Sequence, residues 1–262
     1  MPEHSPAQKQ YLLRVRRKKY MIHVSRILLF LGFLFLWEVS ARRRWIDSFI
    51  FSSPSEIWQT FFTMIQDQSL FTHIGITLTE TLVSFVFTVF LGTAVLLWCC
   101  PKLSRILEPY LVVLNSLPKS ALAPLLIVWL GANIRTIIVA GMSVAIFGSI
   151  INLYTGFREA DPEKLKLIRT LGGTKKDELT KIVLPSSVPL ILSVMKVNIG
   201  LCLVGVIIGE FIGARQGLGY LIIYGSQTFK LTWVLMSIVI LCVIAMGLYA
   251  ILDFIEKRAQ KW

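Results

Sequence analysis

Long blocks without a charged residue constrain this chain more than any other feature. Three of them are Thr81–Pro101, Thr136–Phe157 and Val197–Gly209. A helix that spans a bilayer needs about 20 mainly apolar residues, whereas a surface helix of a soluble protein is apolar on one face only. Hydrophobic residues make up 55% of the 262 and charged residues 16%, against about 45–50% and about 25% in soluble domains. The sequence therefore predicts an all-α, polytopic membrane protein.

The apolar blocks predict about six spans. We place them near residues 22–40, 74–99, 106–130, 134–157, 185–208 and 233–254. Pro109, Pro118 and Pro124 interrupt the third span, and a glycine-rich link is expected over 209–225. The first block is longer than the apolar core of a signal peptide, so we expect it to remain as a span.

These spans divide the chain into four parts. Residues 1–21 form a basic tail, 22–72 hold the first span and an outer segment, 73–255 hold the other spans with a polar loop at 158–184, and 256–262 form a charged tail. In the outer segment, Ser53, Pro54 and Glu56 are typical of a helix N-terminus. Apolar residues recur at helical spacing after them, which predicts an amphipathic helix.

The positions of the basic residues predict the orientation of the chain in the membrane. With the N-terminus in the cytoplasm, 18 of the 27 Lys and Arg fall in inner segments and 6 in outer segments. Inner segments of membrane proteins carry such an excess, so we expect both termini to be cytoplasmic. Arg42–Arg44, in an outer segment, opposes this bias. The net charge of +12 does not indicate a nucleic-acid partner, because the basic residues lie between the spans.

The polar loop begins with the pattern of a short amphipathic helix. Asp161 stands before a proline and a glutamate, which predicts a capped helix start. Leu165, Ile168 and Leu171 follow on one face, and Gly172–Gly173 predicts the end of the helix. An apolar face at the cytoplasmic surface needs something to pack on. The loop therefore either docks a partner or only orients the spans around it.

A second short helix is predicted after the glycines. Thr174 followed three residues later by Asp177 is a weak capping pattern. Ile182 is one of its apolar residues, and Pro185 stands where the first turn of a helix tolerates proline. We therefore expect Pro185 to open the fifth span.

Four residues of this loop stand in the order G-x9-I-x-L-P: Gly172, Ile182, Leu184 and Pro185. This spacing resembles the signature of binding-protein-dependent ABC importer permeases. The Glu-Ala-Ala that opens the signature is absent, and Lys166–Ile168 stands in its place. The resemblance implies the type I ABC importer transmembrane fold for residues 73–255. It also implies that the loop couples the spans to a separate ATPase through Leu165, Ile168, Leu171, Gly172, Gly173, Ile182, Leu184 and Pro185.

Two further stretches carry the same resemblance. Leu117–Gly131 resembles the proline-bearing third span of these permeases. Glu210–Ile222 is similar to the stretch after the fifth span in the subgroup that imports nitrate, taurine, alkanesulfonates and thiamine-precursor pyrimidines. The substrate stays open among nitrate, sulfonates, bicarbonate, pyrimidine precursors and flavins.

The resemblance implies an assembly as well as a fold. It implies an ABC ATPase subunit, an extracytoplasmic solute-binding protein, a homodimer of this chain, and membrane lipid around it in the bacterial inner membrane. The sequence has no G-x-x-x-x-G-K-[ST] phosphate loop. ATP is therefore expected to bind the partner, and this chain is expected to hold no cofactor, no metal and no catalytic residue.

Polar residues within spans are costly and often mark pathways. We consider Asn115, Ser116, Lys196 and Glu210 as candidates for the substrate path. Glu210 could instead form an interfacial ion pair near Arg215. Lys196 could instead reach water with its long stem, and Asn115 and Ser116 could only shape packing.

Two other classes of protein are alternatives to the interpretation as an importer permease. An ion-coupled secondary transporter would also have about six spans, but it would not need the two-helix loop. A membrane-embedded enzyme would need catalytic polar residues gathered at one depth, and the sequence shows no such group.

Overall fold

The computed structural model describes residues 6–90 and 101–259, and these parts contain helices and no strand. The helices are α1 (Pro6–Arg42), α2 (Ser48–Phe51), α3 (Pro54–Gln66), α4 (Ser69–Phe90), α6 (Pro101–Ser116), α7 (Lys119–Leu130), α8 (Ile134–Arg158), α9 (Pro162–Thr170), α10 (Lys175–Glu178), the π-helical turn η1 (Leu179–Val183), α11 (Leu184–Gly213), α12 (Leu218–Gln227) and α13 (Leu231–Ala259). Within the described ranges, five helices can each cross a membrane, and the bent pair α6–α7 makes up to six. The predicted all-α, polytopic class is confirmed. The last nine residues of the predicted second span lie outside the described residues.

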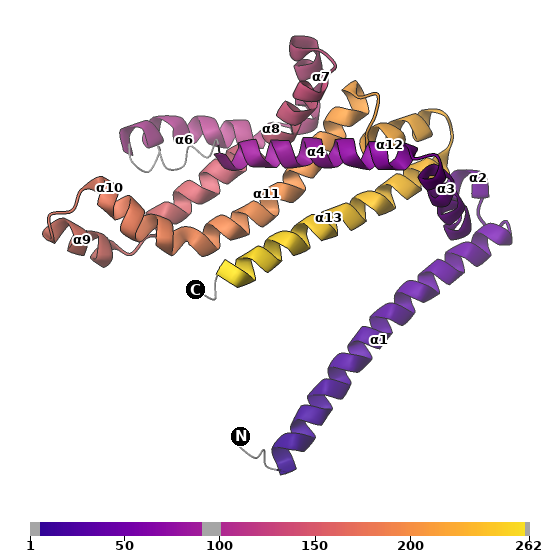
Figure 1. The fold of residues 1–262 in the computed structure, drawn as a ribbon, viewed down its shortest axis with the longest axis horizontal. Coiled ribbons are helices and arrows are strands. Elements are labelled where there is room, and N and C mark those ends of the chain that lie inside the picture. The colour runs from indigo at the N-terminus through magenta and orange to yellow at the C-terminus, as the bar shows by residue number, and fades with distance from the viewer. Residues whose placement is uncertain (1–5, 91–100, 260–262) are drawn as a thin grey trace.

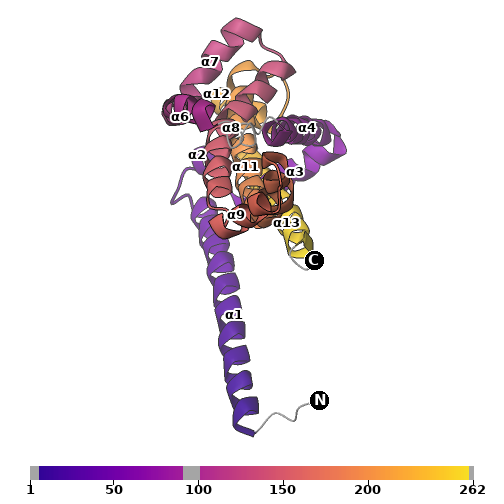
Figure 2. The ribbon, with the colours of Figure 1, turned by 90° about the vertical axis from the view of Figure 1, so that its left-hand side faces the viewer.

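Helices α4, α8, α11 and α13 run side by side, whereas α1 diverges from them (Figures 1 and 2). Glycines let three of these helices approach closely. A Cβ added at Gly141 of α8 would lie 2.6 Å from the hydroxyl of Ser84 in α4 and 2.8 Å from Val206 in α11. Small residues at such positions permit close packing within a bilayer.

The predicted third span is not one straight helix. It breaks between Ser116 and Lys119, and its two halves, α6 and α7, meet at an angle of 96°. Pro118 stands in the break with an extended ψ of 95°. Proline has no N–H to donate and disfavours a helical residue before it, so the chain turns there. Pro109 and Pro124, by contrast, remain inside helices.

The amphipathic helix predicted in the outer segment is confirmed as α3. Ser53 caps it, and its Oγ accepts a hydrogen bond of 3.3 Å from the N–H of Glu56. Met64 of α3 lies in one buried cluster with Leu221 of α12 and Met236 of α13. The helix therefore closes the end of the bundle where α12 lies (Figure 1).

Of two predicted boundaries after the polar loop, one is confirmed and one is wrong. Pro185 lies in the first turn of α11, as predicted, although the chain is helical without a break from Lys175 to Gly213. The π-helical turn η1 precedes it, which is one way a helix accommodates the missing proline N–H. The link predicted over 209–225 is mostly helical too: only residues 214–217 separate α11 from α12.

Candidate coupling loop and solute path

Helix α9 forms at the predicted capping signal. The Oδ1 of Asp161 accepts a hydrogen bond of 2.9 Å from the N–H of Glu163, and Pro162 is the first helical residue. Leu165 packs on a buried cluster at the end of α8 that contains Phe157 and Ala160. One face of α9 is therefore fixed to the end of the bundle.

The glycine turn ends α9 for two separate reasons. Gly172 has φ +78°, in the left-handed region that favours glycine. Gly173 donates to the carbonyl oxygen of Ile168 at 2.9 Å, and a Cβ added there would lie 2.9 Å from the same oxygen. Gly172 needs its backbone freedom, and Gly173 needs its missing side chain.

Helix α10 starts at a complete capping box. Thr174 accepts from the N–H of Asp177 at 3.4 Å, and the Asp177 carboxylate accepts from the N–H of Thr174 at 2.9 Å. Hydrogen bonds from Lys181 and Thr174 hold the pKa of Asp177 below its usual range. The weak pattern seen in the sequence therefore gives a well-formed cap.

An ion pair joins the two short helices across the turn. Arg169 of α9 makes two hydrogen bonds to the carboxylate of Glu178 in α10, at 2.5 and 3.2 Å. Glu178 is buried, whereas Arg169 is mostly exposed. The hydrogen bonds from Arg169 lower the pKa of Glu178, and the carboxylate in turn raises the pKa of Arg169. The loop is thus a fixed helix–turn–helix unit.

The eight residues predicted for coupling lie in different surroundings. Leu165 and Leu184 pack on the buried cluster that includes Leu179 and Val183. Ile168, Gly173 and Ile182 are half-buried, whereas Leu171, Gly172 and Pro185 are exposed. Leu167 is also exposed, at 58%, beside Leu171 at 75%. The sequence analysis did not single out Leu167, because this residue does not belong to the predicted apolar face of Leu165, Ile168 and Leu171.

The four residues predicted for the path are not brought together. Asn115 accepts a hydrogen bond of 3.2 Å from Lys119, and Ser116 donates to the carbonyl of Val112 at 2.8 Å within its own helix. Lys196 forms an ion pair with Glu256 of α13. The structure thus gives Lys196 a protein partner in place of solvent.

Glu210 is completely buried and organises the start of α12. Its carboxylate accepts hydrogen bonds from the hydroxyl of Thr77 at 2.6 Å and from the N–H of Gly219 at 2.5 Å. The buried carboxyl group of Glu80 lies beside it. Within the described residues Glu210 makes no ion pair with Arg215, so that alternative is wrong.

The remaining N–H groups at the start of α12 also find acceptors. His73 Nδ1 accepts from the N–H of Gly217 at 2.9 Å, and Thr77 Oγ1 accepts from that of Leu218 at 2.8 Å. The first N–H groups of a helix have no partner within the helix. Here the side chains of α4 and of Glu210 supply the acceptors. These hydrogen bonds hold α12 in place, although its ten residues are too few to cross a bilayer.

A polar groove of about 390 Å³ follows the seam between α8 and α11. Its polar side chains are Asn152, Thr155, Glu159, Ser193 and Asn198. Asn198 is buried and donates to Ser149 at 2.8 Å. Sequence reasoning missed this set, although spacings of three and four place 152, 155 and 159 on one face of α8.

Comparison with known proteins explains this arrangement. Residues 89–261 match the family described as the binding-protein-dependent transport system inner membrane component. The chain belongs to this family. Its function is therefore that of the membrane-spanning permease component of a binding-protein-dependent ABC importer, and it is a transport component rather than an enzyme. The importer prediction is confirmed, and the ion-coupled alternative is not favoured.

Several relatives of this permease resemble it along most of its length. A probable ABC transporter permease of Haemophilus influenzae is 28% identical over 240 residues, covering 90% of this chain and 97% of the relative. The formylaminopyrimidine transport permease ThiX of Halalkalibacterium halodurans is 29% identical, covering 74% of this chain and 77% of the relative. The putative aliphatic sulfonates permease SsuC of Bacillus subtilis is 25% identical, covering 87% and 83%.

A solved structure shows the same fold. The permease resembles a chain of the inward-facing MetNI methionine ABC transporter with a TM-score of 0.61 and 21% identity, covering 74% of this chain and 97% of that one. At this identity the likeness concerns the fold alone. The predicted type I ABC importer fold is confirmed.

Proposed function

We propose that the permease passes a neutral or weakly basic heteroaromatic solute of the aminopyrimidine class along the groove between α8 and α11. This proposal rests on the polar side chains that line the groove. Among the described residues that line it are two amides, two hydroxyls and the carboxylate of Glu159, but no Lys or Arg. Amides and hydroxyls pair with ring nitrogens and amino groups, and a carboxylate repels a sulfonate. The similarity to ThiX supports the same class.

A sulfonate is the second candidate, because one cation lies at the end of this groove. Lys119 donates to Asn115 Oδ1 and, at 3.0 Å, to the carbonyl oxygen of Val144. A Cβ added at Gly148, which lines the groove, would lie 3.3 Å from that Asn115 oxygen. An ammonium group has three donors, so one is left for an anion.

Uptake by proteoliposomes that contain the permease, its ATPase and its solute-binding protein tests the two classes. An aminopyrimidine should be taken up and taurine should not. Ser193→Leu should block uptake while ATPase assembly persists, and Thr79→Leu on the exposed face of α4 is the matched control. Uptake of taurine that fails in Lys119→Met, but survives in Ser193→Leu, would assign the second class instead.

The α9–α10 loop is proposed to receive the ATPase, which binds the ATP. Its exposed apolar side chains, Leu167 and Leu171, need a partner outside this chain. Co-purification of the ATPase with wild type, and its loss or uncoupling in Gly172→Arg, is the expected result. A wild-type permease that purifies alone and still moves solute would contradict the proposal.

A homodimer is proposed from the position of α7. This helix points away from the bundle (Figures 1 and 2), and Val128 and Trp129 are 80% and 69% exposed. A second copy would cover them around a shared path. Cysteine cross-linking at position 128 within one purified complex should give a dimer of this chain, and a sister permease in its place would contradict it.

We also propose that both termini lie in the cytoplasm. The C-terminal end of α13 lies at the same end of the bundle as α9 and α10, and α2, α3 and α12 lie at the other (Figure 1). The excess of basic residues in the segments assigned to the inside supports this orientation. Labelling of single cysteines from either side of inner-membrane vesicles checks it.

A further inference from the structure

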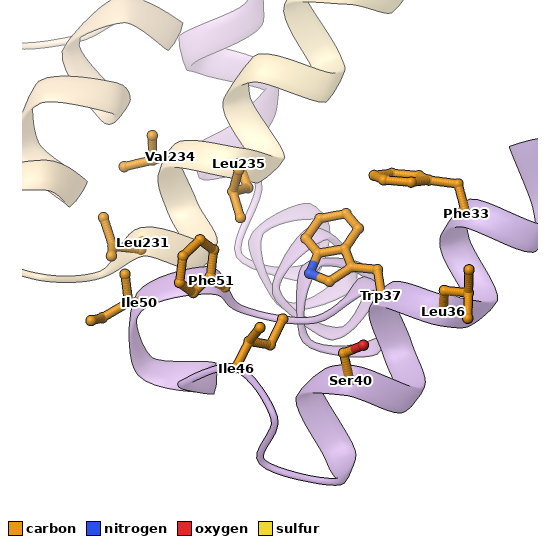
Figure 3. Close-up of a pocket in the computed structure, with 10 residues that line it drawn as sticks. All are labelled: Phe33, Leu36, Trp37, Ser40, Ile46, Ile50, Phe51, Leu231, Val234 and Leu235. Atoms are coloured by element: carbon orange, nitrogen blue, oxygen red, sulfur yellow. The ribbon is translucent and has the colours of Figure 1, made fainter.

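An apolar groove of about 500 Å³ lies where the end of α1, helix α2 and the start of α13 come together (Figure 3). Phe33 and Trp37 line it from α1, Phe51 from α2, and Leu231 and Leu235 from α13. Apart from the indole N–H of Trp37, Ser40 supplies the only polar side-chain group among the described residues of its wall. Beyond this point α1 diverges from the bundle (Figure 1).

The turn after α1 places free positive charge at one end of this groove. Arg42–Arg44 lies between Ser40 and Ile46, two residues of the groove wall, and the N–H of Trp45 holds the turn by donating to the Ser40 carbonyl at 3.0 Å. Arg42 is paired with Glu38 at 2.6 Å. Arg43 and Arg44 are exposed, and neither makes an ion pair within the described part of the chain.

These two features specify an occupant. An apolar groove open to the hydrocarbon of a bilayer accepts a fatty acyl chain, and two unpaired guanidinium groups bind phosphate oxygens in a planar, bidentate manner. A phospholipid carries both groups in one molecule. Its net charge should be negative, because basic clusters at a membrane surface attract anionic lipids.

We propose that this groove and Arg43–Arg44 bind one anionic phospholipid, with an acyl chain beside Trp37 and Leu235 and the phosphate at the arginines. The site would lie in the outer leaflet of the membrane. It accounts for the basic run that opposes the positive-inside bias, since these arginines then serve lipid binding rather than orientation. This inference does not depend on the identity of the transported solute.

Lipid retention by the purified permease–ATPase complex tests the proposal. Native mass spectrometry with added phosphatidylglycerol should show a tightly held lipid, retained about tenfold or more better than in Arg43→Gln/Arg44→Gln. Lys102→Gln/Arg105→Gln removes the same charge elsewhere and should retain it. Leu235→Trp fills the groove and should release the lipid, whereas Val239→Trp, an exposed position of α13 outside the groove, should not.

Three outcomes would overturn it. Equal retention of phosphatidylglycerol by wild type and the arginine variant would exclude the site. Displacement of the lipid by excess inorganic phosphate would show an anion site that does not need the groove. A cross-link between two copies through Trp37→Cys, with no lipid retained by wild type, would assign the groove to a second copy of this chain.

Discussion

Glu210 of α11 accepts a hydrogen bond of 2.5 Å from the N–H of Gly219, nine residues later, and so caps the helix that follows it. A carboxylate at this place suits the partial positive charge of a helix N-terminus. Glu80 places a second buried carboxyl group beside that of Glu210, and the two can share a hydrogen bond only when one of them carries a proton. Neither feature follows from the glycine-rich appearance of this stretch.

The first prediction concerns Gly217. Its φ is +117°, and a Cβ there would lie 2.6 Å from the Oε2 of Glu210. Gly217→Ala should therefore destabilise the start of α12 by about 2–3 kcal/mol, measured as thermal unfolding in detergent. Gly200→Ala is the control, because a Cβ at that position of α11 meets nothing within 4 Å. Equal stability of the two variants would contradict the close approach.

The second prediction separates the two glutamates. Glu80→Gln should be tolerated, because an amide N–H can donate a hydrogen bond to the neighbouring carboxylate of Glu210. Glu210→Leu should be poorly folded, since it leaves the buried N–H of Gly219 and the hydroxyl of Thr77 without an acceptor, at about 1–3 kcal/mol each. The yield of monodisperse protein checks both. The reverse order would assign the capping role to Glu80.

The third prediction is a pH dependence of the α9–α10 loop. Arg169 lowers the pKa of Glu178 from its ordinary value of 4.5, so the ion pair stabilises the loop fully above that value. The stabilisation is lost as the pH falls through the lowered pKa. Hydrogen exchange of residues 162–183, corrected for intrinsic rates, should increase at that acidic limit in wild type.

Glu178→Gln should remove the part of this dependence that follows the titration of Glu178, with faster exchange already at neutral pH, whereas the part due to Asp177 should remain. Glu163→Gln, in the exposed first turn of α9, is the matched control and should keep it. An unchanged pH profile in Glu178→Gln would show that the ion pair does not hold the turn.

The fourth prediction concerns the end of the bundle where α13 ends. Lys196 of α11 pairs with Glu256 and, at 3.6 Å, with Asp253 of α13. Lys196→Met should lower the Tm, because two carboxylates then lose their shared cation. The exchange Lys196→Glu/Glu256→Lys should recover about half of the loss or more if the pair itself matters. No recovery would indicate that packing of the lysine stem carries the effect.

Local signals in the sequence were sufficient for much of the fold. The charge-free blocks determined the all-α membrane class, since a bilayer accepts only segments of that length and composition. The caps at Ser53, Asp161 and Thr174 were predictable because a cap involves residues two or three positions apart. The G-x9-I-x-L-P spacing likewise identified the family without any contact in space.

Contacts between distant residues required the tertiary structure. The sequence could not place Glu210 against Thr77, 133 positions earlier, or bring Asn198 to Ser149, because nothing local specifies which helices pack together. It identified Pro118 as an interruption but not the 96° bend, whose size depends on where α6 and α7 find partners. The composition determined that this chain is a membrane protein. Helix packing decided which of its costly polar groups are buried and hydrogen-bonded, as Glu210 is, and which line the groove between α8 and α11.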